Sequence, residues 1–287
     1  MKHADVMDTL TAKYPLLTKA GKKVADFIFA NHEEAQFLSI TALAEECSVA
    51  EATVFRFCQT LGYSGYNDFK LGLAKAYGAA AGTDNEYSLY GKISESDSID
   101  EMCRKLYATN VSAITQTLEL VDEAMIKQAV DYLRGARRVY CFGQGGSMVL
   151  AMEAWARFLT ASPNFYCIED AHLQAMSASM LEKNDAVLFF TYSGATKDML
   201  DVLRPAKERG AKVIVLTHFK KSPAAAYADI LLLCGSKEGP LQSGSVAAKM
   251  GNLFLIDILF NEFCRRSPEE CLINKELTTN SIADKLL

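Results

Sequence analysis

The stretch that decides the fold of the second half of the chain is Arg138-Val139-Tyr140-Cys141-Phe142-Gly143-Gln144-Gly145-Gly146-Ser147. An apolar and β-branched run leads directly into a glycine-rich loop, which indicates a buried strand that ends in a tight turn. Similar runs follow at Phe165–Ile168, Ala186–Thr191, Lys212–Thr217 and Asp229–Cys234, and helical segments follow the first and third runs at Met148–Thr160 and Lys197–Arg209. Continuous apolar strands separated by helices predict a parallel sheet covered on both faces.

Five strands of this kind fit a flavodoxin-like order, in which a ligand site forms between the first and third strands. The loops after these two strands are Gly143–Ser147 and Thr191-Tyr192-Ser193-Gly194-Ala195-Thr196. Each loop lies between the carboxyl end of a strand and the start of a helix, where free N–H groups and the helix dipole favour an anion. Glycines allow close backbone approach and hydroxyls donate hydrogen bonds, so the loops suit a phosphate monoester.

Two other interpretations of these loops stay open. Glycine, Ser and Thr are also ordinary residues of turns and helix caps. Gly143-x-Gly145 begins a dinucleotide-binding fingerprint, and Glu169 follows the second strand, but Met148 takes the place of the third glycine. That fragment alone is weak evidence for an NAD-linked enzyme.

Composition restricts the class of protein. The chain has 287 residues and a net charge of −5, which suits two domains or one large one and excludes a globally basic nucleic-acid coat. Its eight Cys form no C-x-x-C pair, so no zinc site is expected. The first residues lack the apolar stretch of a signal peptide, and apolar runs are too short to span a bilayer. We therefore expect a cytoplasmic protein with reduced thiols, no metal, no cofactor and no membrane partner.

The first half of the chain is predicted to be helical, and residues 39–61 fit a helix, a tight turn and a second helix. Val54, Cys58 and Leu61 recur at helical spacing and predict the buried face of the second helix. The opposite face then carries Thr53, Arg56 and Gln59, where a helix-turn-helix presents side chains to the DNA major groove.

A plain helical hairpin is the alternative to DNA binding. Residues 1–77 hold eight Lys and Arg against nine Asp and Glu, a net charge of −1, which does not favour binding to phosphates. Some basic residues do cluster, however, because Lys19, Lys22 and Lys23 fall together at one helix start. We count Lys22 and Lys23 among the candidate DNA-binding residues.

Residues 128–260 resemble a SIS (sugar isomerase) domain, a phosphosugar-binding domain built on a five-stranded parallel sheet. The second loop is similar to the S-x-S-G-x-T phosphate loop of that family, with Thr191 in place of its first Ser. The resemblance implies a set of phosphate-binding residues, namely Gly145, Ser147, Thr191, Ser193, Gly194 and Thr196. It also implies a set that lines the sugar, namely His172, Gln242, Ser243 and Ser245.

Residues 17–77 resemble the N-terminal domain of RpiR-type transcriptional regulators, a family that joins this domain to a C-terminal SIS domain. The matching pieces are Ser39-Ile40-x-x-Leu43-Ala44, Ala52–Cys58 and Leu61-Gly62-Tyr63-x-Gly65-Tyr66-x-x-Phe69-Lys70. Two residues depart from the family pattern. Ser48 stands where the turn Gly is usual, and Ala50 stands where a helix-capping Ser is usual.

Catalysis is not expected. SIS isomerases carry a Glu that acts as the general base, shortly before the last helix of the domain. Our alignment places Gln242 at that position, although Glu238 or Glu169 could act as the base instead. The chain is therefore predicted to be a DNA-binding regulator whose operator affinity is controlled by a sugar phosphate. A phosphosugar isomerase with an accessory helical domain is the alternative.

The expected architecture is an all-α helix-turn-helix domain at 1–78, a linker at 79–98 and an α/β SIS domain with flanking helices at 99–287. A homodimer or homotetramer is expected, with residues 99–134 and 269–287 as candidate contact elements.

Overall fold

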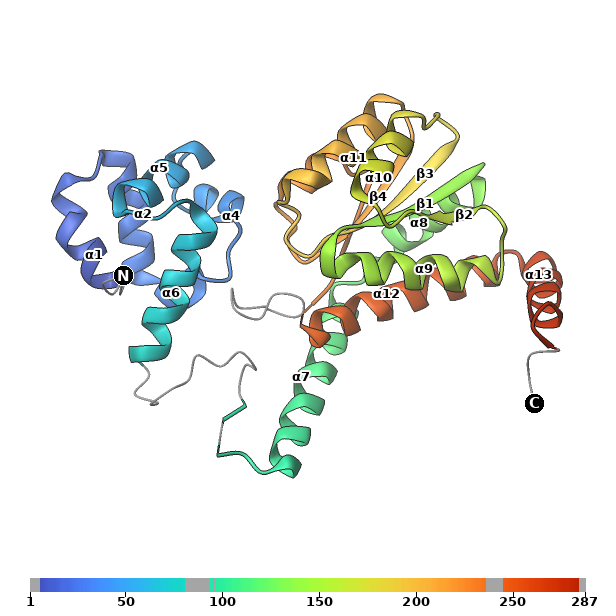
Figure 1. Ribbon diagram of the computed structural model, residues 1–287, viewed down its shortest axis with the longest axis horizontal. Coiled ribbons are helices and arrows are strands. Elements are labelled where there is room, and N and C mark those ends of the chain that lie inside the picture. The colour runs from blue at the N-terminus through green and yellow to red at the C-terminus, as the bar shows by residue number, and fades with distance from the viewer. Residues whose placement is uncertain (1–5, 81–92, 95, 236–244, 284–287) are drawn as a thin grey trace. The chain divides into compact units, whose positions relative to one another are not determined.

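The computed structural model describes residues 6–80, 93, 94, 96–235 and 245–283 (Figure 1). The chain divides into two compact units. The N-terminal unit holds Ser245 and the described residues up to Thr109, and the C-terminal unit holds those from Asn110 to 235 together with those from Val246 on. Within the described part of the chain, no helix is long and apolar enough to cross a membrane.

The N-terminal unit is helical, as predicted. Its elements are α1 (Val6–Lys13), a 3-10 turn (Tyr14–Leu16), α2 (Lys19–Ala30), α3 (His32–Ala35), α4 (Ile40–Glu46), α5 (Glu51–Leu61) and α6 (Tyr66–Ala80). Side-chain caps begin two of these helices, because Thr18 accepts from the Gly21 amide and Ser39 accepts from the Ala42 amide. Gly62, with φ of 101°, ends α5 in the left-handed conformation that glycine favours.

One hydrophobic core holds the N-terminal helices together. Its largest fully buried side chains include Leu10, Ile28, Leu43 and Phe69. Cys58 belongs to this core, and burial raises the pKa of its thiol to about 12. That thiol therefore stays protonated, which fits the expectation of a reduced, unreactive cysteine.

The C-terminal unit contains a parallel sheet of five strands in the order β2-β1-β3-β4-β5, which confirms the flavodoxin-like prediction. The strands are β1 (Arg138–Gly143), β2 (Phe165–Cys167), β3 (Asp185–Phe190), β4 (Lys212–Thr217) and β5 (Ile230–Leu233). β3 is buried along its whole length. The chain leaves β1 toward one edge and reaches β3 on the other side of β1, so the sheet has a switch point between these two strands.

Helices cover both faces of this sheet (Figure 1). They are α8 (Glu123–Gly135), α9 (Met148–Leu159), α10 (Ala171–Ser179), α11 (Lys197–Glu208) and α12 (Val246–Arg265), followed by α13 (Pro268–Asn280). Side chains of α8, α9 and α12 share one buried cluster with one face of the strands. Side chains of α10 and α11 share a second cluster with the other face, which includes Phe142 of β1.

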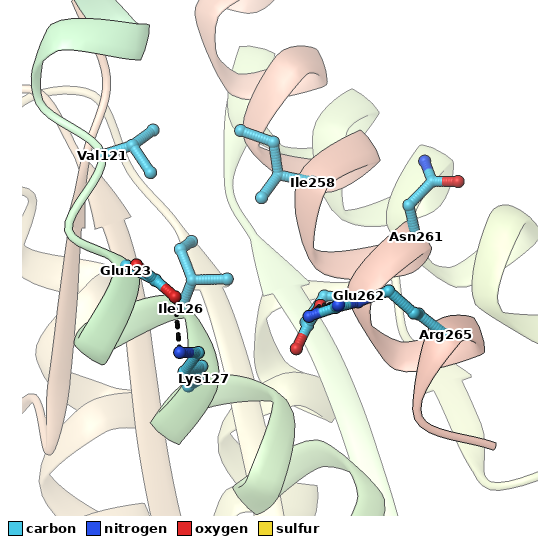
Figure 2. A pocket seen from close by; sticks show the side chains of 8 residues that line it. All are labelled: Val121, Glu123, Ile126, Lys127, Ile258, Asn261, Glu262 and Arg265. Atoms are coloured by element: carbon cyan, nitrogen blue, oxygen red, sulfur yellow. Dashed lines mark hydrogen bonds and ion pairs between the residues drawn. The ribbon is translucent and has the colours of Figure 1, made fainter.

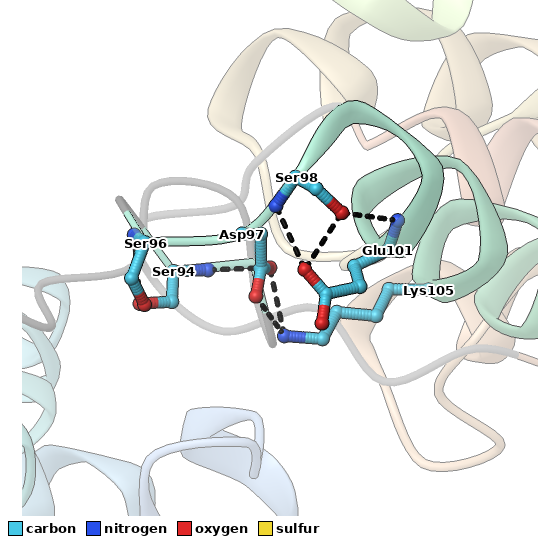
Figure 3. Close-up of polar contacts among 6 residues, drawn as sticks. All are labelled: Ser94, Ser96, Asp97, Ser98, Glu101 and Lys105. Atoms are coloured by element: carbon cyan, nitrogen blue, oxygen red, sulfur yellow. Dashed lines mark hydrogen bonds and ion pairs between the residues drawn. The ribbon is translucent and has the colours of Figure 1, made fainter.

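Helix α7 (Ile99–Glu119) begins with a capping box (Figure 3). The Glu101 carboxylate accepts from the amide and hydroxyl of Ser98, and the Ser98 hydroxyl accepts from the Glu101 amide. Lys105 forms an ion pair with Asp97 at 2.7 Å. These contacts fix the start of α7 at Ile99, close to the point where the sequence predicts a helix.

The last turns of α7 pack into the C-terminal unit. Thr117 is fully buried, and its hydroxyl accepts a hydrogen bond from the Gly235 amide at 2.9 Å. The same hydroxyl donates to the Ala113 carbonyl. The buried bond to Gly235 therefore anchors the end of α7 beside the end of β5.

A groove of about 350 Å³ separates α8 from α12 (Figure 2). Ile126 and Ile258 line its apolar part, while ion pairs of Glu123 with Lys127 and of Glu262 with Arg265 lie along it. In each pair at least one of the two side chains is half exposed or more, so the ion pairs add little to the stability of the fold.

Candidate functional site

The backbone of the loop after β1 packs closely against the residues that lead into α9. A Cβ on Gly143 would lie 2.6 Å from the Ser147 carbonyl oxygen, so only glycine fits there. Gly145 has φ of 54°, a left-handed conformation that costs glycine little. Ser147 then precedes α9 and its hydroxyl makes no capping bond, which leaves that hydroxyl available to a ligand.

The loop after β3 carries three hydroxyls in different settings. Thr191 is buried, and its hydroxyl accepts from the Gly194 amide at 3.1 Å. The Ser193 hydroxyl accepts from the Ala195 amide at 3.3 Å. Thr196 is exposed directly before α11, and its side chain makes no capping bond. Ser193 and Thr196 therefore keep donor hydroxyls near the start of a helix.

The sheet register brings the two loops together. Gly143 of β1 pairs with Phe190 of β3, so the two loops begin at neighbouring strand ends. Strands in a sheet are about 4.8 Å apart, which places the residues that follow them side by side. Helices α9 and α11 both start there, and their free N–H groups favour an anion.

Two buried polar residues that the sequence analysis did not single out lie against these loops. The Gln174 side chain is fully buried and donates to the carbonyl oxygens of Gly143 at 2.9 Å and Ile168 at 2.7 Å. Ser222 is 6% exposed, and its Oγ lies 2.4 Å from the position of a Cβ on Gly194. No pattern in the local sequence marks either residue, because both act through tertiary contacts.

Of the four residues predicted to line the sugar, the structure describes two. His172 lies exposed in the first turn of α10, and Ser245 is half-buried immediately before α12. Gln242 and Ser243 lie outside the described residues, as does Glu238, one of the two candidate bases. The other, Glu169, is exposed after β2.

In the N-terminal unit, α4 and α5 form the predicted helix-turn-helix. Ser48 has φ of 50° at the turn, where the family usually has glycine. The turn is closed by backbone hydrogen bonds from the Ser48 amide to Glu45 and from the Val49 amide to Ala44, both at 2.8 Å. The polypeptide therefore makes the family's turn without its glycine.

Candidate DNA-binding side chains lie on the outer face of α5. Arg56 and Gln59 are exposed, and Thr53 is half-buried. Thr53 and Arg56 line a hollow of about 320 Å³ together with residues at the start of α2. The basic residues at that start differ, because Lys23 is exposed whereas the Lys22 ammonium lies 5.3 Å from the centre of the Tyr14 ring.

The missing cap of α5 leads to a stability prediction. Ala50 occupies the N-cap position with extended backbone and makes no side-chain cap. Ala50→Ser would supply an acceptor for the first free N–H groups and should raise the free energy of unfolding by about 1 kcal/mol. Urea unfolding of the wild type and the variant measures this change. Ala52→Ser, within the first turn of the same helix, is the control, and an equal gain there would contradict the capping argument.

Both units match known protein families. Residues 4–80 match the model of the helix-turn-helix domain of the rpiR family, and residues 132–261 match the SIS domain. An uncharacterized HTH-type transcriptional regulator of Haemophilus influenzae is 30% identical over 284 residues, covering 99% of this chain and 98% of the relative. HTH-type transcriptional regulator HexR of Pseudomonas aeruginosa is 31% identical over 213 residues, covering 74% of this chain and 73% of HexR.

A solved structure resembles nearly the whole chain. The Vibrio vulnificus NanR protein, solved in complex with ManNAc-6P, is 28% identical and superposes with a TM-score of 0.86, covering 98% of this chain and 99% of that one. Together with the two domain matches and the relatives, this likeness establishes the family. The chain belongs to the RpiR family of helix-turn-helix transcriptional regulators that carry a SIS domain.

Proposed function

We propose that this protein is a transcriptional regulator of carbohydrate metabolism whose operator affinity is controlled by a sugar phosphate bound in the SIS domain. The observation that carries the proposal is the pair of glycine- and hydroxyl-rich loops at neighbouring strand ends, in a chain of the RpiR family. The complex of NanR with ManNAc-6P supports a sugar phosphate as the ligand class. As a regulator of bacterial type, the protein would act in the cytoplasm.

Hydroxyls and backbone amides hold the phosphate in this proposal. Ser147, Thr191, Ser193 and Thr196 donate hydrogen bonds to the phosphate oxygens, and Gly145 and Gly194 allow the backbone to approach them. The starts of α9 and α11 add the field of two helix dipoles. A phosphate can therefore be bound here without a cluster of Lys and Arg. His172, Gln242, Ser243 and Ser245 would line the sugar.

The N-terminal domain supplies DNA recognition. Arg56 and Gln59 face outward on α5 and would contact base edges or phosphates, with Thr53 beside them. Lys23, and with a change of rotamer Lys22, would contact the DNA backbone. Because residues 1–77 carry a net charge of −1, tight binding requires a specific site and two or more copies of the domain.

The proposed organisation is a helix-turn-helix domain at 1–78, a linker at 79–98 and a SIS domain with flanking helices at 99–287, assembled as a homodimer or homotetramer. Exposed apolar side chains on α13, Leu272, Ile273 and Leu277, suit a contact between copies. Sugar phosphate binding then alters operator affinity, provided that the effector prefers one arrangement of the domains.

We propose binding without catalysis, because Gln242 stands where related isomerases have their base. A thermal-shift screen of sugar phosphates, ManNAc-6P among them, tests the proposed ligand class on the full-length protein. A ligand at about 100 times its Kd should stabilise the fold by about 2.7 kcal/mol and raise its melting temperature by several degrees. Unphosphorylated sugars should have no such effect. Stabilisation by a sugar and its phosphate alike would contradict the proposal, and turnover of a sugar phosphate would favour the isomerase alternative.

A further inference from the structure

We propose that Gln144, in the loop after β1, reads the sugar part of the bound sugar phosphate and so determines which sugar is accepted. This inference rests on the proposed function. Both polar atoms at the end of the Gln144 side chain, Oε1 and Nε2, are buried and have no hydrogen-bond partner. Buried amide groups are nearly always paired in native proteins, so this side chain is suited to a partner that arrives with the ligand.

Gln144 is held in place by its neighbours rather than by its own side chain. Gly143 before it belongs to β1, and the carbonyl of Gly143 accepts from the buried Gln174 amide at 2.9 Å. The carbonyl of Gln144 itself accepts from the Ser147 amide at 3.1 Å. The backbone at Gln144 is therefore fixed on both sides, and its unpaired side chain is not the result of a loose loop.

The backbone also decides which way the side chain leaves the sheet. Gln144 has extended backbone, with φ of −132° and ψ of 148°, so it continues the alternation of β1. Its side chain thus leaves on the same face as Phe142, which is the face that α10 and α11 cover. His172 lies in the first turn of α10, and Thr196 precedes α11. Gln144 therefore directly follows β1, which lies in the sheet between β2, the strand before His172, and β3, the strand before Thr196.

The chemistry of an amide fits the sugar rather than the phosphate. A Gln side chain offers two donors and one acceptor with no charge, which matches a hydroxyl or an amido substituent that donates and accepts at once. The phosphate oxygens only accept, and the Ser and Thr hydroxyls already supply donors for them. A site whose buried polar groups need a partner rejects ligands that lack the matching group.

The test compares wild type with Gln144→Met, which keeps the length of the side chain and removes its polar atoms. Affinities for ManNAc-6P, glucose 6-phosphate, fructose 6-phosphate and inorganic phosphate are measured on the full-length protein by calorimetry or thermal shift. Gln128→Met, an exposed glutamine on α8, is the matched control. We expect Gln144→Met to weaken binding of the best sugar phosphate about tenfold to hundredfold and to leave the affinity for inorganic phosphate unchanged. The unliganded melting temperature should rise slightly, because the variant removes a buried amide that has no hydrogen-bond partner.

Each other outcome overturns the inference in a recognisable way. Unchanged sugar phosphate affinity would show that Gln144 does not contact the sugar. Equal loss of inorganic phosphate, with a lower unliganded melting temperature, would assign Gln144 to loop structure. If the wild-type protein binds none of these sugar phosphates, the proposed function fails as well, and the wild-type titration alone reveals that case.

Discussion

Replacing Ser193 and Thr196 together with alanine should remove sugar phosphate binding from an otherwise intact protein. A hydrogen bond to a charged group contributes about 1.5–3 kcal/mol, so loss of two such bonds should weaken binding by roughly a hundredfold or more. The fold should tolerate the change. The Ser193 hydroxyl accepts one local bond from Ala195, and Thr196 makes no capping bond.

The measurement is the ligand-induced rise in melting temperature, followed by direct titration. Ser112→Ala with Thr115→Ala removes one Ser and one Thr hydroxyl from an exposed part of α7 and serves as the matched control. That control should bind the ligand as the wild type does. A double variant of Ser193 and Thr196 that keeps the full thermal shift would place the phosphate elsewhere.

Arg56→Ala should weaken operator binding about tenfold to hundredfold and leave sugar phosphate binding unchanged. Arg56 is exposed on the outer face of α5, and its guanidinium donates to the Ala52 carbonyl of its own helix. The side chain is therefore not needed for the core and is free to turn toward DNA. A good bidentate contact to guanine provides about 1–3 kcal/mol of discrimination, which gives the size of the expected loss.

Lys75→Ala, which removes one exposed positive charge from α6, is the control for a general change in charge. Binding to a DNA fragment selected from a random pool, measured at several salt concentrations, separates the possible contacts. If Arg56 contacts a base, Arg56→Ala should relax the sequence specificity of DNA binding. If Arg56 contacts a phosphate, the variant should keep its sequence specificity, and the slope of log affinity against log salt concentration should fall by about one. Equal loss of effector binding would contradict the assignment of the two functions to separate domains.

The parts of the fold that local sequence patterns determine could be predicted well. β3 is buried throughout and is apolar from Ala186 to Phe190, and the glycine loops after β1 and β3 marked the ends of those strands. Parallel strands need long crossover connections, which are usually helical, and the alternation of strands and helices fitted a flavodoxin-like order. The buried stripe of α5 followed from helical spacing, and Val54 and Cys58 are indeed fully buried.

The features that depend on tertiary contacts could not be predicted from those patterns. Gln174 bonds to a carbonyl 31 residues away, and no local periodicity reveals such a contact. Ser222 meets Gly194 only because the chain after β4 folds back over the loop after β3. Lys22 was grouped with Lys23 because both are basic, yet the fold directs its ammonium to the Tyr14 ring.

The turn of the helix-turn-helix illustrates the limit of a family pattern. Ser48 adopts the left-handed conformation without being glycine, which costs roughly 1–2 kcal/mol. The backbone bonds from Ser48 and Val49 and the burial of Leu43 hold this turn in place. The packing of the two helices therefore outweighs the local preference of the residue at the turn.

The measurement that tests the central claim most directly is operator affinity with and without the best sugar phosphate, for the wild type and for the variant in which Ser193 and Thr196 are alanine. Coupling of 1–3 kcal/mol is typical, so saturating ligand should change the wild-type Kd for DNA by about 5-fold to 150-fold in one direction. The variant should bind DNA normally and show no response. The account would be contradicted if the ligand left the operator affinity of the wild type unchanged. It would also be contradicted if the ligand changed the operator affinity of both proteins equally.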